Sequence, residues 1–175
     1  MPMIPEFYST TLKRKRVIEE QEYEYFLNIS VHHAEDIDSV TRHPDGAKRI
    51  YRVIGWVNPG DEFITPAAEG LPNPEWNIKY QVPLGMYDPY KYLNLEVVRV
   101  WSKSDPGTSS GCILVGRAQI PLPKLNQKKG EQQGGSHSRR HGLVAPPAAG
   151  SGVVADGHII VAMEVKRRPA YFYGR

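Results

Sequence analysis

The sequence predicts an all-β protein, and more closely an antiparallel β-sandwich of seven or eight strands, from three observations. Short runs in which apolar and polar residues alternate recur along the chain, and this is the period of a strand with one buried face. Turn-forming Gly, Pro, Asn and Asp residues separate these runs about every 8 to 15 residues. No segment has the periodicity of a long helix, and 16 glycines and 15 prolines in 175 residues are typical of strands joined by loops.

The first two predicted strands flank a polar loop. The first strand covers residues 22–31 and places five apolar residues on one face: Tyr23, Tyr25, Leu27, Ile29 and Val31. Residues 34–47 are polar and are predicted to form a loop. The second strand covers residues 48–57, and the turn-forming sequence 58–60 (Asn-Pro-Gly) ends it.

Two further strands are predicted before residue 85. A short third strand covers residues 62–67, and residues 69–75 form a turn rich in Gly and Pro. The fourth strand covers residues 76–82, where Trp76, Ile78, Tyr80 and Val82 alternate with polar residues. Residues 85–89 then turn the chain into the next hairpin.

The pattern is clearest between residues 92 and 122, where two apolar runs flank a polar turn. In the first run Leu93, Leu95 and Val97 share one face, and the apolar residues change face at Val98. This change predicts a β-bulge or a twist near that position. Pro121 ends the pairing of the second run, because proline has no backbone N–H to donate.

The remaining segments define the predicted domain organisation. Residues 1–21 form a flexible basic N-terminal arm, and residues 22–168 form the sandwich. Within the sandwich, residues 124–152 are rich in Gly, Ser and Pro and are predicted to be a mobile insertion, interrupted by a brief strand over residues 142–145. The last strand covers residues 157–165, and residues 169–175 form an aromatic and basic tail.

The composition also indicates in which cellular compartment the protein is expected. The single cysteine, Cys112, excludes an internal disulfide and suits a reducing environment. No run of about 18 apolar residues is present, and the N-terminus carries the basic run 13–16 where a signal sequence would need an apolar core. We expect a cytoplasmic protein, peripheral to a membrane or nuclear as alternatives.

The sequence carries no motif of catalysis. There is no Gly-x-Ser-x-Gly, no phosphate-binding glycine loop and no His-Glu-x-x-His, and Cys112 has no evident paired base. The histidines do not have the spacing of a zinc site. The three tryptophans are expected to pack in or around the core: Trp56, Trp76 and Trp101. No recognition module for a specific nucleic acid is visible, so we predict a protein that is not an enzyme.

Five segments together resemble a known family. Residues 26–37 resemble the pattern L-x-I-x-V-x-x-A-x-x-L, residues 51–57 resemble Y-V-x-V, and residues 73–77 read Asn-Pro-Glu-Trp-Asn. Residues 114–122 resemble x-x-G-x-x-x-I-P-L, and residues 156–161 fit a closing strand. In this order, over residues 22–168, they resemble a C2 domain of the small single-domain plant type. The resemblance implies an eight-stranded sandwich whose loops cluster at one end.

The same resemblance implies where calcium would bind. Family members that bind calcium use acidic residues on those loops, since Ca²⁺ takes about 6–8 oxygen ligands. Here Arg49 stands at an acidic position of the first loop, and the later loop keeps only Asp105, beside Lys103. The remaining metal candidates are Asp36, Asp38, Asp45 and Asp105. Because Arg49 and Lys103 would repel a cation, we expect no calcium and no other cofactor.

Anionic ligands are the alternative that the resemblance implies, through a basic groove for phospholipid head groups. The candidate lipid- or anion-binding residues are Lys48, Arg49, Arg52, Lys79, Lys103 and Trp101. The competing interpretation is that these are ordinary outward-facing residues. Basic clusters in the arm and the tail could add electrostatic attraction to an anionic surface.

These observations predict a non-catalytic, C2-like binding module that works without calcium. It would dock on a protein partner or on an anionic phospholipid membrane. Two alternatives stay open: a calcium-dependent phospholipid-binding protein, and a structural subunit of a larger complex. The sequence does not identify the partner.

Overall fold

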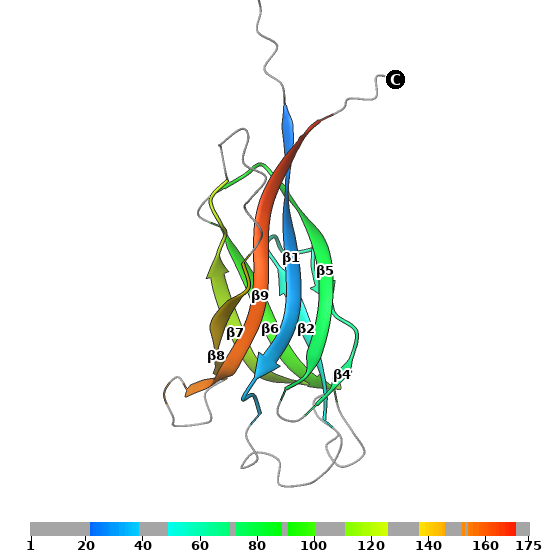
Figure 1. The fold of residues 1–175 in the computed structure, drawn as a ribbon, viewed down its shortest axis with the longest axis vertical. Coiled ribbons are helices and arrows are strands. Elements are labelled where there is room, and N and C mark those ends of the chain that lie inside the picture. The colour runs from blue at the N-terminus through cyan, green and yellow to red at the C-terminus, as the bar shows by residue number, and fades with distance from the viewer. Residues whose placement is uncertain are drawn as a thin grey trace, which may run out of the picture.

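The described part of the chain consists of strands and connecting segments (Figure 1). The computed structural model describes residues 22–38, 49–70, 73–88, 91–100, 111–125, 137–145, 152 and 154–170. Its nine strands are β1 (Tyr23–Glu35), β2 (Ile50–Trp56), β3 (Phe63–Ile64), β4 (Ala68–Glu69), β5 (Glu75–Gly85), β6 (Tyr92–Val100), β7 (Cys112–Pro121), β8 (Arg139–Ala145) and β9 (Val154–Pro169). None of the described segments is a helix long and apolar enough to cross a membrane.

The strands form two antiparallel layers that face each other (Figure 1). The hydrogen-bonded order is β3-β2-β6-β7-β8-β9-β1-β5, with β4 paired to β2. The first layer contains β8, β9, β1 and β5, and the second contains β3, β2, β6 and β7. Where the order passes between layers, β7 and β8 pair in register at Arg117 and Val144. The predicted antiparallel β-sandwich is therefore confirmed.

The predicted eight strands differ from the observed nine in the segment 62–69. Only β3 lies within the strand expected over residues 62–67, and the second short strand, β4, follows it; both are paired to β2. Thr65 lies between them, and its hydroxyl oxygen accepts a hydrogen bond from the backbone N–H of Val53 at 2.9 Å. The Thr65 side chain thus provides an acceptor for a backbone N–H of β2 at the point where residues 65–67 do not pair as a strand.

The core lies between the layers and is built from alternate residues of each strand. Leu27, Ile29 and Val31 of β1 point inward, as predicted. In β2 the inward residues are Tyr51 and Val53, so Ile50, Ile54 and Trp56 face outward. Burying a large apolar side chain contributes about 1.5–3 kcal/mol, and this alternation decides which face of each strand remains available for binding.

Two local predictions about strands can be compared directly with the pairing. The register of β6 against β7 shifts between Val97 and Val98, so an irregularity lies where it was predicted. The extra residue is Val115 of β7, and β6 itself keeps its alternation against β2. Strand β8 begins at Arg139, before the predicted start at Gly142. A full strand therefore lies inside the segment that was expected to be a mobile insertion, and it closes the first layer beside β9.

Different parts of the chain form the two ends of the sandwich. At one end β1 begins beside the end of β9, with Tyr23 paired to Pro169 and the Ala170 N–H donating to the Glu22 carbonyl at 2.9 Å. At the other end β1 finishes at Glu35, and the chain turns at Asp36 and Asp38 with φ angles of 53° and 57°. Aspartate tolerates this left-handed conformation better than most residues.

Candidate functional site

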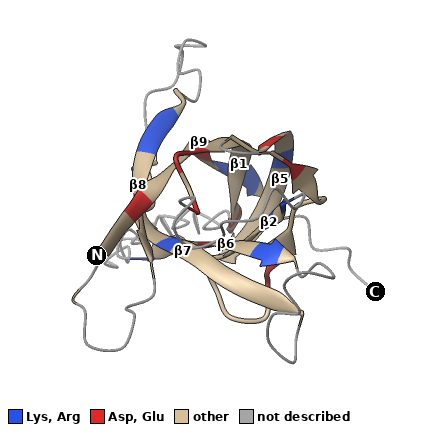
Figure 2. Ribbon diagram, turned by 90° about the horizontal axis from the view of Figure 1, so that it is seen from below, with Lys and Arg blue, Asp and Glu red and all other residues tan. Residues whose placement is uncertain are grey.

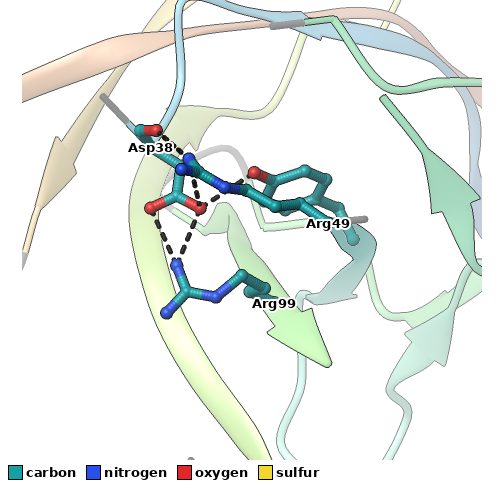
Figure 3. A network of polar contacts seen from close by, with 4 residues as sticks. Asp38, Arg49 and Arg99 are labelled. Atoms are coloured by element: carbon teal, nitrogen blue, oxygen red, sulfur yellow. Dashed lines mark hydrogen bonds and ion pairs between the residues drawn. The ribbon is translucent and has the colours of Figure 1, made fainter. Parts of the chain in front are cut away.

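A buried carboxylate, that of Asp38, organises the end of the sandwich where β1 finishes (Figure 3). Asp38 is 2% exposed. Nη1 of Arg99 donates to both carboxylate oxygens, at 2.8 Å to Oδ1 and 2.7 Å to Oδ2. The Tyr51 hydroxyl donates to Oδ2 at 2.8 Å. The carboxylate is therefore held by donors from β2 and β6 together.

A second buried arginine fixes the backbone of the same turn. Arg49 is 6% exposed, and its Nη1 donates to the Asp38 carbonyl at 2.7 Å. The same nitrogen lies 3.7 Å from the Asp38 Oδ2. Arg99 is 4% exposed, so two guanidinium groups and one carboxylate share a site with little access to water. A buried charge is tolerated only when it is paired and hydrogen-bonded.

This arrangement bears directly on metal binding. Calcium would need carboxylate oxygens that are free to coordinate it, whereas the Asp38 oxygens accept hydrogen bonds from Arg99 and Tyr51. Two guanidinium charges beside the carboxylate would also repel a dication. Within the described ranges, no three His, Cys, Asp or Glu side chains are grouped so that they could hold a metal ion.

The Asp38 network predicts how stability depends on alkaline pH. Burial, and then the hydrogen bond to Asp38, raise the pKa of Tyr51. Because the pKa is higher in the folded than in the unfolded state, its contribution is complete below the unfolded value of about 10 and decreases as pH rises beyond it. We expect the free energy of unfolding to fall above about pH 10, and less steeply in Tyr51→Phe. Urea unfolding above about pH 10 measures how steeply the free energy of unfolding falls with pH in each variant. Tyr92→Phe, at an exposed tyrosine, is the control. If the free energy fell equally steeply in Tyr51→Phe and Tyr92→Phe, the prediction would be wrong.

The second feature of interest is the outward surface of the second layer. Register pairing places one row of side chains across five strands: Ile64, Ile54, Glu96, Arg117 and Val144. The next row contains Trp56, Asn94 and Gln119. Ile64 is 54% exposed and Val144 is 38% exposed. Large aliphatic side chains thus remain in water at both edges of this surface.

A groove of about 640 Å³ runs over the middle of this surface. Trp56 and Val144 line its sides, and Glu96 lies 3.5 Å from Arg117 within it. The Gln119 amide donates to the Asn94 side-chain oxygen at 3.3 Å. We call this surface the β2–β6–β7 face, and its residues are Arg52, Trp56, Ile64, Glu96, Arg117 and Val144.

Comparison with known proteins identifies the architecture. No protein-family model and no curated protein sequence matches the chain. Among solved structures, a match is found to the C2 domain labelled A in plant extended synaptotagmin 1. The match covers 83% of this chain and 95% of that domain, with a TM-score of 0.52 and 16% sequence identity. The chain has the fold of a C2 domain.

Two other solved structures also match. A C2 domain-containing protein from a putative elicitor-responsive gene is 16% identical, with a TM-score of 0.48 over 87% of this chain and 94% of its own length. A human GIVD cytosolic phospholipase A2 is 13% identical, with a TM-score of 0.50 over 83% of this chain and 17% of the enzyme. At these identities, the comparisons establish the C2 fold alone.

The C2 fold separates residues that the sequence grouped as one basic groove. Arg52 lies on the outward side of β2 in the second layer, and Lys79 lies on the outward side of β5 in the first layer. Arg49 faces Asp38 instead of the surface, so it does not fit the interpretation as an anion-binding residue. Asp36 is exposed. The other candidates lie outside the described residues: Lys48, Lys103, Trp101, Asp45 and Asp105.

Sequence reasoning missed Arg99 and Tyr51 as parts of the loop end of this C2 fold. Arg99 interrupts the apolar run of β6. It lies on the same side of the strand as the inward residues Leu93, Leu95 and Val97, and it pairs with the buried Tyr51 of β2. A lone arginine that continues the buried face of an apolar strand is the signal that could have indicated a buried ion pair.

Proposed function

We propose that this C2-fold chain is a non-catalytic docking module that works without calcium and binds a partner protein through the β2–β6–β7 face. The observation that carries the proposal is the Asp38 carboxylate, whose oxygens accept hydrogen bonds from Arg99 and Tyr51. These donors supply the positive charge and the rigidity that a bound cation would otherwise give the loop. The turn at Asp38 is then held in place at any calcium concentration.

The composition of the β2–β6–β7 face supports a protein as its partner. Exposed or half-buried Trp, Arg and aliphatic side chains around a groove are typical of protein interfaces and of their energetically dominant residues. The face has two arginines, Arg52 and Arg117, and one glutamate, Glu96. Figure 2 shows basic and acidic segments interspersed over both layers of the described strands. This mixed distribution favours shape and apolar contact over attraction to an anionic membrane.

Calcium independence can be tested by titration calorimetry of the purified chain with CaCl₂. We expect no heat of binding beyond dilution, because the buried Asp38 carboxylate at this end is neutralised by arginine. The matched control is Arg99→Asn, which removes one guanidinium and leaves the carboxylate, so any heat that this variant gains would come from the released carboxylate. A saturable heat from the unaltered chain would contradict the proposal.

The docking face can be tested by photo-crosslinking in cells. A benzoylphenylalanine at exposed Ile64 should capture a defined partner, and Arg52→Glu with Val144→Asp in the same chain should abolish that product. The same probe at Gln81, on the outward side of β5, is the positional control. A product that survives both substitutions, or that forms equally from Gln81, would place docking elsewhere.

Vesicle sedimentation distinguishes the membrane alternative. Pelleting with phosphatidylserine vesicles that Arg52→Glu and Lys79→Glu each reduce would favour an anionic membrane as the ligand instead of a protein. A plant cell as the setting, and membership of a larger complex, stay predictions from the family resemblance.

A further inference from the structure

The outward surface of the first layer carries a second, polar hollow, distinct from the β2–β6–β7 face. It has a volume of about 410 Å³ and crosses three neighbouring strands, β5, β1 and β9. Its side chains are Asn28 and Ser30 of β1, Lys79 and Gln81 of β5, and Glu164 and Lys166 of β9. Volumes of about 300–1,000 Å³ are usual for small-molecule sites.

The strand under this hollow presents polar side chains outward. Strand β1 is an inner strand, paired to β9 on one side and to β5 on the other, and Asn28 and Ser30 lie on its outward side. Asn is depleted in strands, whereas β-branched and aromatic residues are enriched. Outward polar residues also occur on β2 and β6 of the other layer, where Arg52, Asn94 and Glu96 lie beside Ile54 and Val98. The hollow is therefore distinguished by the lysines that flank its polar floor.

The register brings these polar groups together in three neighbouring rows. Gln81, Asn28 and Glu164 are cross-strand neighbours in the middle row. Lys79 lies opposite Ser30 in the row on one side, and Lys166 lies opposite Phe26 in the row on the other side. The Gln81 amide donates to the Asn28 side-chain oxygen at 3.3 Å, which orients both amides. The short Ser30 side chain leaves room between Lys79 on one strand and the pair Glu164 and Lys166, 3.4 Å apart, on another.

The charges define the ligand that this hollow fits. Lys79 and Lys166 carry two positive charges and Glu164 one negative charge, so the hollow has a net charge of +1 from these three side chains. Amides, a hydroxyl and a carboxylate supply both donors and acceptors, as hydroxyl groups require. An anion alone would use the lysines and would not use the amides, the hydroxyl or the carboxylate.

We propose that the β5–β1–β9 hollow binds a small soluble phosphorylated polyol, such as a sugar phosphate. Lys79 and Lys166 would bind the phosphate as point charges. Asn28, Gln81 and Ser30 would bind hydroxyl groups, and Glu164 would accept a hydrogen bond from a hydroxyl while it remains beside Lys166. This site is on the layer opposite the docking face, and the inference does not depend on protein docking.

The test is an NMR titration of the full chain with glucose 6-phosphate, using glucose and inorganic phosphate as matched probes. We expect amide shifts confined to β5, β1 and β9, with both control probes binding roughly tenfold or more weakly. Lys79→Gln should weaken binding by roughly tenfold, and Ser30→Val should do so by filling the hollow. Arg52→Gln, on the opposite layer, should leave the affinity unchanged.

Several results would overturn the site. These are equal binding of inorganic phosphate, shifts that map to β2, β6 and β7, an affinity unaffected by Lys79→Gln, and no shifts with glucose 6-phosphate. Binding to vesicles that contain phosphatidylinositol phosphate, without binding to the free sugar phosphate, would show a lipid head group as the source and would also contradict the soluble ligand. Retained signal dispersion in each variant shows that it is folded.

Discussion

Replacing Arg99 with methionine should destabilise the domain by about 3–5 kcal/mol, one of the two largest effects that we expect. The substitution removes the guanidinium that donates to both oxygens of Asp38. Asp38 is 2% exposed, so its charge would stay buried with fewer partners. An uncompensated buried charge costs far more than the loss of a surface ion pair.

Urea unfolding of Arg99→Met measures this cost, and Arg52→Met is the matched control. Arg52 lies on the exposed side of a neighbouring strand, and its loss should change the free energy of unfolding by no more than about 0.5 kcal/mol. Adding Asp38→Asn to Arg99→Met should recover part of the loss, because the uncompensated charge is gone. Equal costs for the two single variants would show that the buried ion pair has no special role.

Replacing Gly157 with alanine should also cost several kcal/mol. Gly157 has a φ of 73°, and a Cβ at this position would lie 2.3 Å from the Glu35 carbonyl oxygen and 2.7 Å from that of Asp36. The left-handed conformation contributes about 1–2 kcal/mol, and the backbone clash adds about 1–3 kcal/mol. Because the clash is with the turn that leads to Asp38, the loop end should be displaced as well.

Gly85→Ala separates the two contributions. Gly85 has a φ of 66°, and nothing lies within 4 Å of an added Cβ. This control should therefore cost only the conformational part, about 1–2 kcal/mol. Thermal and urea unfolding of both variants give the difference. If Gly157→Ala costs no more than Gly85→Ala, the close approach of β9 to the turn after β1 is not rigid.

The strands with the most regular alternation were predictable from local sequence. Leu27, Ile29 and Val31 mark β1, and Leu93, Leu95 and Val97 mark β6, because a period of two needs no knowledge of the partner strand. The change of face at Val98 indicated an irregularity at this point, but it could not show that the extra residue is on the partner strand β7. The short strands β3 and β4 were not separable, since two residues carry no periodicity.

The candidate site was less predictable because it depends on contacts between distant residues. Asp38 and Arg99 are 61 residues apart in sequence. The pairing of β2 with β6 places Arg99 beside Tyr51, and the side chains of both residues reach the Asp38 carboxylate after the end of β1. Arg49 looks like a surface residue in its polar context, and its burial follows from Asp38. In the same way, the local pattern could not show that Arg52 and Lys79 belong to different layers.

The pairing of Tyr23 with Pro169, and the hydrogen bond from Ala170 to Glu22, have a mechanical consequence. Tension applied through the segments before Glu22 and after Ala170 would act across the ladder between β1 and β9. The hydrogen bonds would then load one after another, as in opening a zipper, instead of sharing the force in shear. The fold should therefore yield at low force in single-molecule stretching, despite its extensive buried core.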